Sequence, residues 1–326
     1  MSEKIIKLEP PLRVGVVGVG HLGRFHAQKY LELDGVELVG IYDIDPNQAE
    51  KVATELGIEL FRELDTLFAQ VQAISIATPT STHFELARQA LDIGLDVLVE
   101  KPITTTTDEA KTLVELARKH QRILQVGLLE RFNPVFTKTR QYLKNPRFIE
   151  VHRLAPFSFR SLDIDVILDL MIHDIDLVHE LTNSPATSID AVGVPVISEQ
   201  IDIANIRIHF ANGAIANLTA SRVSLNRERR IRIFQPNGYF SLDFANFTAT
   251  VCQRLPGGKG FGPLPEIKAR ELKFPAGDNL KAEIADFIAA VRQRRPPVVD
   301  GAAGLRALET AFRIKEAIKL QQGTWL

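Results

Sequence analysis

The first 129 residues contain five short apolar segments rich in β-branched residues, separated by longer stretches of helical character. The segments predict strands buried on both faces of a parallel sheet, and they cover residues 12–19, 36–42, 71–77, 95–99 and 122–127. Helix-end signals lie between them: Asp45-Pro46 before and Gly57 after one helix, and the capping-box pairs Thr82/Glu85 and Thr106/Glu109. This alternation predicts a doubly wound α/β Rossmann domain over residues 1–129.

From residue 130 onward the pattern changes to fewer helices and many short strands. We expect helices over 134–144 and 163–182, then strands with turn signals from about 188 to 274, and closing helices over 279–294 and 302–322. The turn signals Ala211-Asn212-Gly213 and Pro236-Asn237-Gly238 favour hairpins. Residues 130–326 are therefore expected to form an α+β domain with a mostly antiparallel sheet.

Composition and charge place the chain among soluble globular proteins. It has 326 residues, 45% of them hydrophobic, and a net charge of −1. This balance argues against a protein that wraps nucleic acid or an anionic membrane. No segment approaches the roughly 18 apolar residues of a membrane helix. The single cysteine, Cys252, cannot form an internal disulfide or a thiolate zinc site, so we expect a cytoplasmic protein without a metal.

A glycine motif follows the first predicted strand and opens the first predicted helix. It spans Gly18, Gly20, His21, Leu22 and Gly23, in the spacing G-x-G-x-x-G. Gly18 permits a tight turn, Gly20 lets a pyrophosphate approach the helix N-terminus, and Gly23 permits close helix–strand packing. Asp43, at the end of the second strand, has the position of a carboxylate that binds adenosine ribose hydroxyls. Because that carboxylate repels a 2′-phosphate, the motif favours NAD over NADP.

Further polar residues follow later strands at the same sheet edge, where open α/β folds bind ligands. We expect cofactor contacts from Thr78, Pro79, Thr80, His83, Glu100 and Lys101, although a turn, a helix cap and a surface histidine also explain the first four. Pro102 biases Lys101 away from helical backbone angles and holds it at the strand end. Its ammonium group could polarise a substrate oxygen, whereas an isolated lysine before a turn is usually only solvated.

The predicted helix over 163–182 contains Asp169 and His173, four residues apart and therefore expected on one helix face. A histidine can accept the proton of an alcohol as its hydride leaves. The alternative is that both lie on the wet side of an amphipathic helix with Asp165, Asp174, Asp176 and His179. A metal site at His173-Asp174 lacks companion histidines at helical spacing.

These three motifs together resemble the glucose-fructose oxidoreductase and inositol dehydrogenase (Gfo/Idh/MocA) family over essentially the whole chain. The resemblance rests on GVGHLG with Asp43, on Glu100-Lys101-Pro102, and on D-x-x-x-H at 169–173. It implies an oxidoreductase that acts on CH–OH groups with a nicotinamide cofactor. It assigns Lys101, Asp169 and His173 as the catalytic residues, and it implies a homodimer or homotetramer formed through the C-terminal sheet.

A second set of motifs resembles the subgroup that oxidises the 3-hydroxyl of UDP-N-acetylglucosamine to a ketone. The set comprises Glu130-Arg131-Phe132-Asn133-Pro134, His152-Arg153-Leu154-Ala155-Pro156, Arg160-Ser161, and the bulky stretch 166–173 before His173. In that subgroup a separate aminotransferase aminates the ketone on the way to a diamino sugar of lipid A. We accordingly expect Arg131, Asn133, Arg153, Arg160 and His173 to bind the nucleotide sugar, with guanidinium groups on its diphosphate.

Two alternatives stay open at this point. One is an inositol dehydrogenase or another sugar or polyol dehydrogenase of the same family. The other is an NAD-binding sensor without turnover, which the presence of Lys101, Asp169 and His173 disfavours. A basic stretch over 222–232 is interpreted as a strand's solvent face or a subunit contact, and the glycines over 257–262 as a hairpin connection.

Overall fold

The computed structural model describes residues 10–157, 164–259 and 265–322. Its contacts divide the chain into two units. Unit 1 combines Met1–Leu128 with Leu280–Leu305, and unit 2 combines Leu129–Asn279 with Arg306–Leu326. The C-terminal segment therefore contributes to both units, whereas the sequence analysis assigned all of 130–326 to the second domain.

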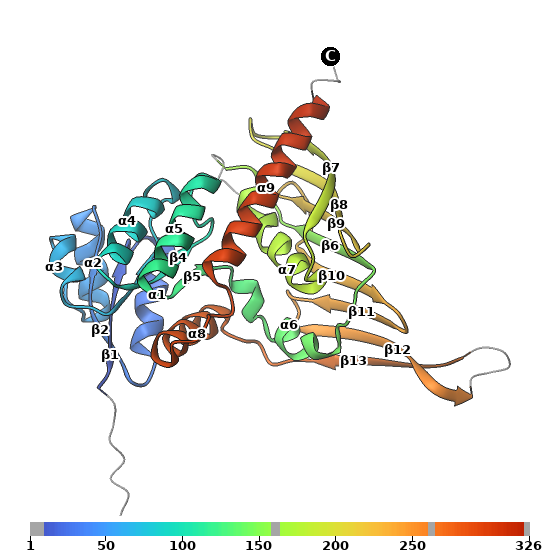
Figure 1. Ribbon diagram of the computed structural model, residues 1–326, viewed down its shortest axis with the longest axis horizontal. Coiled ribbons are helices and arrows are strands. Elements are labelled where there is room, and N and C mark those ends of the chain that lie inside the picture. Colours follow the sequence, from blue (N-terminus) through green and yellow to red (C-terminus); the bar gives the residue numbers. More distant parts are fainter. Residues whose placement is uncertain (1–9, 158–163, 260–264, 323–326) are drawn as a thin grey trace, which may run out of the picture. The chain divides into compact units, whose positions relative to one another are not determined.

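Unit 1 is built on a parallel five-stranded sheet in the order β2-β1-β3-β4-β5 (Figure 1). The strands are β1 Leu12–Val17, β2 Val36–Tyr42, β3 Ala73–Ile76, β4 Asp96–Glu100 and β5 Leu124–Gly127. All five predicted strands are present, most of them shorter than predicted. The strand order reverses between β1 and β3, and ligands of open α/β sheets bind outside the carboxyl ends of strands at such a point.

Helices α1 to α5 of unit 1 lie between these strands in sequence, and α8 is contributed by the C-terminal part of the chain. They are α1 His21–Leu31, α2 Pro46–Leu56, α3 Leu64–Phe68, α4 Thr80–Asp92, α5 Thr107–His120 and α8 Asn279–Gln293. The Asp45 side chain caps α2, which Gly57 ends in a left-handed conformation, as predicted. The capping box of Thr106 and Glu109 also forms. The predicted box at Thr82 and Glu85 is wrong, because α4 already begins at Thr80.

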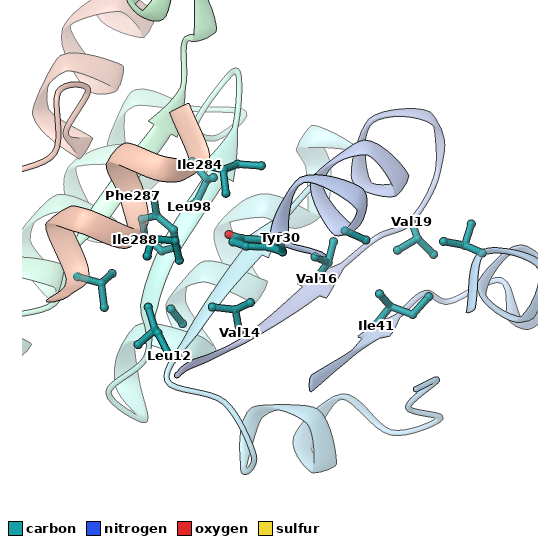
Figure 2. Close-up of a cluster of buried hydrophobic side chains, with 14 of the residues drawn as sticks. Leu12, Val14, Val16, Val19, Tyr30, Ile41, Leu98, Ile284, Phe287 and Ile288 are labelled. Atoms are coloured by element: carbon teal, nitrogen blue, oxygen red, sulfur yellow. The ribbon is translucent and has the colours of Figure 1, made fainter. Parts of the chain in front are cut away.

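Helix α8 belongs to unit 1 because its apolar face completes that unit's core. Ile284, Phe287 and Ile288 of α8 belong to the same buried cluster as Leu12 and Val14 of β1 (Figure 2). Burial of such side chains contributes about 1.5–3 kcal/mol each. A helix that follows the second domain in sequence is thereby part of the first domain in space.

Unit 2 contains an eight-stranded sheet in the order β13-β12-β11-β10-β6-β9-β8-β7. The strands are β6 Phe148–Leu154, β7 Ala186–Val194, β8 Ile203–Phe210, β9 Ile215–Ser221, β10 Glu228–Gln235, β11 Gly238–Asp243, β12 Thr248–Lys259 and β13 Pro265–Lys273. Only the β6–β9 pair is parallel, so the sheet is mostly antiparallel, as predicted. The predicted turns at 211–213 and 236–238 join β8 to β9 and β10 to β11.

One face of this sheet is buried and the other is half-exposed. Ile231 and Ile233 of β10 are fully buried, while Arg230 and Arg232 between them are half-exposed. Helices α7 Ile172–Thr182 and α9 Gly301–Gln322 run along one face of the sheet (Figure 1). The remaining helical elements of unit 2 are the 3₁₀ turns Leu129–Phe132 and Arg140–Tyr142, α6 Pro134–Thr139, and the π-helical turn Ile167–Met171. No helix in the described residues is long and apolar enough to cross a membrane.

Candidate active site

The glycine loop joins β1 to α1 at the point where the strand order reverses. Gly18 has a φ of 82°, which favours glycine, and a Cβ there would lie 2.5 Å from the Thr78 side chain. A Cβ at Gly23 would overlap the carbonyl of Gly18, so this glycine permits the close packing of α1. A Cβ at Gly20 would meet no atom within 4 Å. The loop therefore leaves free space at Gly20, the position predicted for the pyrophosphate.

The N-terminus of α1 is suited to an anion. Gly20 is its N-cap, and no side chain caps it. The first N–H groups of a helix have no partner within the helix and carry a partial positive charge. His21 is exposed and packs edge-on against Phe25, with ring centroids 5.3 Å apart, while Leu22 is half-buried. These features fit the diphosphate of a dinucleotide.

Asp43 ties the glycine loop to the end of β2. Its Oδ2 accepts a hydrogen bond from the Val19 N–H at 2.7 Å, and its Oδ1 accepts one from the Asp45 N–H at 2.9 Å. Each carboxylate oxygen can accept a further bond, so ribose hydroxyls still find acceptors. The adjacent Ile44 has an exposed fraction of 89%. Ile44 was not identified from the sequence. Its exposed apolar surface at this edge is suited to an adenine ring.

The first turn of α4, the helix that follows β3, contains a buried histidine, His83. The two ring nitrogens of His83 each lie 2.9 Å from a backbone carbonyl, one of Pro102 and one of Thr78. Burial lowers the pKa of His83, although these contacts oppose the shift. His83 thus connects the ends of β3 and β4, and its 1% exposure argues against the predicted cofactor contact. Thr78 and Thr80 are half-exposed and Pro79 is exposed, as cofactor contacts require.

The turn after β4 carries Lys101 on a buried support. The Glu100 Oε1 lies 2.9 Å from His26 Nε2, and the Glu100 Oε2 accepts a hydrogen bond from the Lys101 N–H at 3.2 Å. A Cβ at Gly127 would collide with this carboxylate, so the end of β5 requires glycine there. Glu100 is only 5% exposed. It therefore holds the backbone of Lys101, and its predicted contact with the cofactor stays a prediction.

A second acid, Glu283 of α8, is fully buried in unit 1. Burial raises its pKa well above the ordinary value, and the charges of Glu100 and Asp286 add to the shift. Burial and these two negative charges therefore favour the neutral form of Glu283. Neither Glu283 nor His26 was identified from the sequence, because the pattern of a helix does not show which of its several polar residues is buried.

In unit 2 the chain places Asp169 and His173 at the junction of a π-helical turn and α7. Asp169 lies in the π turn Ile167–Met171 and is half-buried, and His173 lies in the first turn of α7 with 9% exposure. π turns are rare and frequently occur at functional sites. The Asp165 side chain precedes this turn and accepts hydrogen bonds from the Ile167 and Leu168 N–H groups.

Two buried ion pairs, which we call the α7 clamp, hold the first turns of α7 through Asp174 and Asp176, which directly follow His173. Arg153 of β6 donates two hydrogen bonds to Asp174 at 2.8 and 2.7 Å and one to Glu130. Arg131 donates two to Asp176, at 2.6 and 2.9 Å. Burial disfavours the charged Arg153, but Asp174 and Glu130 outweigh it and raise its pKa. The clamp arginines stay charged and bidentate, as buried pairs require.

The clamp changes the interpretation of several predicted substrate ligands. Arg131 and Arg153 are 5% and 4% exposed and point their guanidinium groups at carboxylates of their own unit, which argues against diphosphate binding. Asn133 is 2% exposed and caps α6 by accepting from the Val135 N–H, so it is structural as well. Arg160 lies outside the described residues.

The alternative that Asp174 and Asp176 form a wet helix face is wrong, because both are 2% exposed. Arg222 belongs to the basic stretch 222–232, which was interpreted as a solvent face or a subunit contact, but its side chain is buried. It is 5% exposed and donates to Asp202 Oδ1 and to the Ile164 carbonyl, both at 2.7 Å. Arg222 thereby anchors the chain just before the π turn.

Comparison with protein families identifies the two units. Residues 12–128 match the model of an oxidoreductase family with an NAD-binding Rossmann fold, and residues 147–241 match the GFO/IDH/MocA C-terminal domain. The chain belongs to the Gfo/Idh/MocA oxidoreductase family. Its expected fold class is thereby confirmed, and the glycine loop lies within the segment that matches the NAD-binding Rossmann fold.

Two curated relatives are similar over nearly the full chain. UDP-N-acetylglucosamine 3-dehydrogenase from Acidithiobacillus ferrooxidans is 43% identical, with 94% of this chain and 97% of that protein covered. The NAD-dependent scyllo-inositol 2-dehydrogenase from Bacillus subtilis is 31% identical, with 90% of each covered. A solved structure of the Acidithiobacillus ferrooxidans enzyme superposes with a TM-score of 0.90 over 96% of this chain and 99% of that chain.

The chain is therefore an oxidoreductase with a nicotinamide-cofactor fold. The described residues contain no group of three or more His, Cys, Asp or Glu side chains placed to hold a metal ion. Lys101 belongs to unit 1, and Asp169 and His173 belong to unit 2. The predicted catalytic residues therefore come from both units of the chain.

Proposed function

We propose that this chain is an NAD-dependent dehydrogenase that oxidises the 3-hydroxyl of UDP-N-acetylglucosamine to a ketone. The observation that carries the proposal is the 43% identity to an enzyme of that name over 94% of this chain. The relative that acts on inositol is less similar, at 31% identity. The bulky residues Ile167, Leu168 and Met171 around Asp169 also fit the nucleotide-sugar subgroup rather than a generic polyol site.

The cofactor is held by parts of unit 1. The free space at Gly20 and the uncapped N-terminus of α1 receive the pyrophosphate, and Asp43 receives the ribose hydroxyls. Asp43 already accepts the Val19 and Asp45 N–H groups, so it is a fixed negative charge that repels a 2′-phosphate. This supports NAD over NADP. When bound, NAD⁺ accepts the hydride from the reacting carbon.

Residues of this chain accept the proton and orient the sugar. His173 takes the proton of the 3-hydroxyl as the carbon–hydrogen bond breaks and the carbonyl forms. Lys101 donates a hydrogen bond to the same oxygen and lowers its proton affinity, and Asp169 orients the pair. Within unit 1 the Glu100–His26 contact supports the turn that carries Lys101, and within unit 2 the α7 clamp supports the helix that carries His173.

The diphosphate of the substrate requires cations other than the clamp arginines. Arg160, predicted as one of them, remains a candidate. Arg229 is a second candidate because its side chain is 44% exposed and lies next to the clamp, 3.6 Å from Glu130. Burial and the charge of Arg153 lower the pKa of Arg229, as expected for a guanidinium group beside another. An anionic ligand would relieve this repulsion.

We also propose that the protein is a homodimer or homotetramer formed through the half-exposed face of the unit 2 sheet. That face presents Glu150 and His152 of β6, Asn217 and Thr219 of β9, and Arg232 of β10. Arg232 and Glu150 already pair at 3.0 Å, so the face combines charge pairing with hydrogen-bonding groups.

The ketone product would serve as the substrate of a separate aminotransferase in the lipid A route. The single free cysteine, Cys252, supports a cytoplasmic location.

The experiment is a substrate panel with the purified protein. UDP-N-acetylglucosamine, UDP-glucose, myo-inositol and scyllo-inositol are each incubated with NAD⁺ or NADP⁺, and formation of the reduced cofactor is followed. The proposal expects reduction of NAD⁺ by UDP-N-acetylglucosamine at the highest kcat/KM. Turnover of an inositol alone would favour the polyol alternative, and NAD binding without turnover of any compound would favour the sensor.

A further inference from the structure

Unit 1 contains a pocket of about 760 Å³ that is separate from the glycine loop. It is lined by the end of α5, the start of β5 at Ile123 and Leu124, the segment Arg294–Pro297 after α8, and the start of α9. Cofactors of open α/β sheets bind at the carboxyl ends of strands. This pocket lies at the amino end of β5, so it is not the dinucleotide site.

Four arginines line the pocket: Arg118, Arg122, Arg294 and Arg295. Two of them are neutralised, because Arg294 pairs with Asp96 at 2.8 Å and Arg295 with Asp286 at 2.6 Å. The side chains of Arg118 and Arg122 have no hydrogen-bond or ion-pair partner among the described residues. The pocket therefore contains two uncompensated positive charges.

Arg122 is the more informative of the two. Its Nε–H is buried and has no acceptor in the described part of the chain. A buried donor without an acceptor costs about 1–3 kcal/mol. Arg118 lies in the last turn of α5, where the helix dipole also favours a cation. The dipole accounts for Arg118, but it does not explain why Arg122 turns an unsatisfied guanidinium group towards the same pocket.

The remaining lining residues limit the class of ligand. Asp300 is the only carboxylate among them, and its Oδ1 accepts a hydrogen bond from the Ala303 N–H at the start of α9. His120 is 3.9 Å from Asp92. Val114, Ala117, Ile123, Leu124, Pro296 and Pro297 provide an apolar wall. A pocket of this size accommodates a small organic molecule rather than an inorganic ion alone.

We propose that this pocket is a second ligand site, which binds a phosphate-bearing small molecule with an apolar or aromatic portion, such as a nucleotide. Arg118 and Arg122 bind the phosphate oxygens in the bidentate way that guanidinium groups favour. The phosphate supplies the acceptor that the Arg122 Nε–H lacks. The base or other apolar portion packs on the wall formed by the proline pair and Ile123.

The test measures ligand binding by calorimetry while the dinucleotide site is saturated with NAD. Pyrophosphate and ADP are the probes. The proposal expects saturable binding of both, with ADP tighter because only ADP has a portion for the apolar wall. The double variant Arg118→Gln/Arg122→Gln should raise both dissociation constants about tenfold or more, since charge-assisted hydrogen bonds are worth about 1.5–3 kcal/mol. Its affinity for NAD should be unchanged.

A matched control removes the same charge elsewhere in unit 1. Arg62→Gln suits this purpose because Arg62 is exposed and does not line the pocket. Circular dichroism of each variant checks that it is folded. Three results would overturn the proposal: no saturable binding of either probe in the presence of NAD, equal weakening by Arg62→Gln, or ADP binding no tighter than pyrophosphate.

Discussion

The glycine loop of unit 1 and the α7 clamp of unit 2 are both parts of the candidate site, but they are built differently. The loop binds through backbone: Gly18, Gly20 and Gly23 are effective because a side chain is missing. The clamp acts through side chains that meet from distant positions, such as Arg153 and Asp174, which are 21 residues apart. A site formed by the backbone, such as the glycine loop, can therefore be recognised from the spacing of its glycines. The role of an arginine in a sequence motif can be assigned only when the partner of its side chain is known.

The largest expected effect on turnover concerns two predicted catalytic residues, Lys101 of unit 1 and His173 of unit 2. Lys101→Ala and His173→Ala should each lower kcat by about 10²–10⁴-fold, because each removes a group that acts on the reacting hydroxyl. NAD affinity, measured by calorimetry, should be retained in both. Lys119→Ala, an exposed lysine of unit 1, is the matched control and should keep full turnover. Normal kcat in either variant would remove that residue from the mechanism.

The clamp is tested by removing one of its cations. Arg153→Ala leaves the buried Asp174 without its hydrogen-bonded counterion and Glu130 with only the longer contact to Arg229, so the free energy of unfolding should fall by about 3–5 kcal/mol. The control Arg140→Ala breaks a pair with Glu180 in which the arginine is 39% exposed, and it should cost at most about 1 kcal/mol. Urea denaturation measures both. A stable Arg153→Ala protein with a raised KM for the nucleotide sugar would restore the diphosphate-binding interpretation.

The loop is tested by adding side chains to it. Gly20→Val places atoms in the free space predicted for the pyrophosphate, so the dissociation constant for NAD should rise about tenfold or more while Tm changes little. Gly23→Ala should instead lower Tm, because its Cβ overlaps the Gly18 carbonyl. Calorimetry and thermal unfolding of the two variants separate these effects. If Gly20→Val binds NAD normally, the pyrophosphate does not lie at Gly20.

The smallest effect concerns a histidine beyond the clamp on α7. Burial lowers the pKa of His179 to about 4, and the charges of Arg306, Arg131 and Arg313 add to the shift. Because its folded pKa is below the unfolded value of about 6.5, its neutral form stabilises the fold above that pH. This stability is lost as pH falls towards 4, by about 3 kcal/mol.

His179→Gln keeps a group that can bond the Thr310 hydroxyl, which lies 2.8 Å from His179 Nε2. The pH dependence of its unfolding free energy, measured by urea denaturation, should be shallower than that of the unmodified protein between about pH 6.5 and 4. Identical slopes for the two proteins would show that His179 titrates as freely in the folded state as in the unfolded one.

Features that depend on residues close in sequence were predicted correctly, whereas features that depend on distant partners were not. Both sheets, the α2 cap at Asp45 and the Thr106 capping box were predictable because they depend on neighbouring residues. The placement of α8 in unit 1 was not, because its apolar face is compatible with either core. The π turn was missed since its residues have ordinary helical periodicity. The roles of Arg131, Arg153 and Asn133 were misjudged because burial of a polar side chain depends on partners that no motif shows.

The central claim is that the chain moves a hydride from C3 of UDP-N-acetylglucosamine to NAD⁺. Its most direct test is a single-turnover reaction with UDP-N-acetylglucosamine carrying deuterium at C3, followed by mass spectrometry of the cofactor and the sugar. The account predicts reduced NAD that contains the deuterium and a keto sugar that has lost it. Reduced NAD without deuterium, or no reduction of NAD⁺ by this sugar, would contradict it.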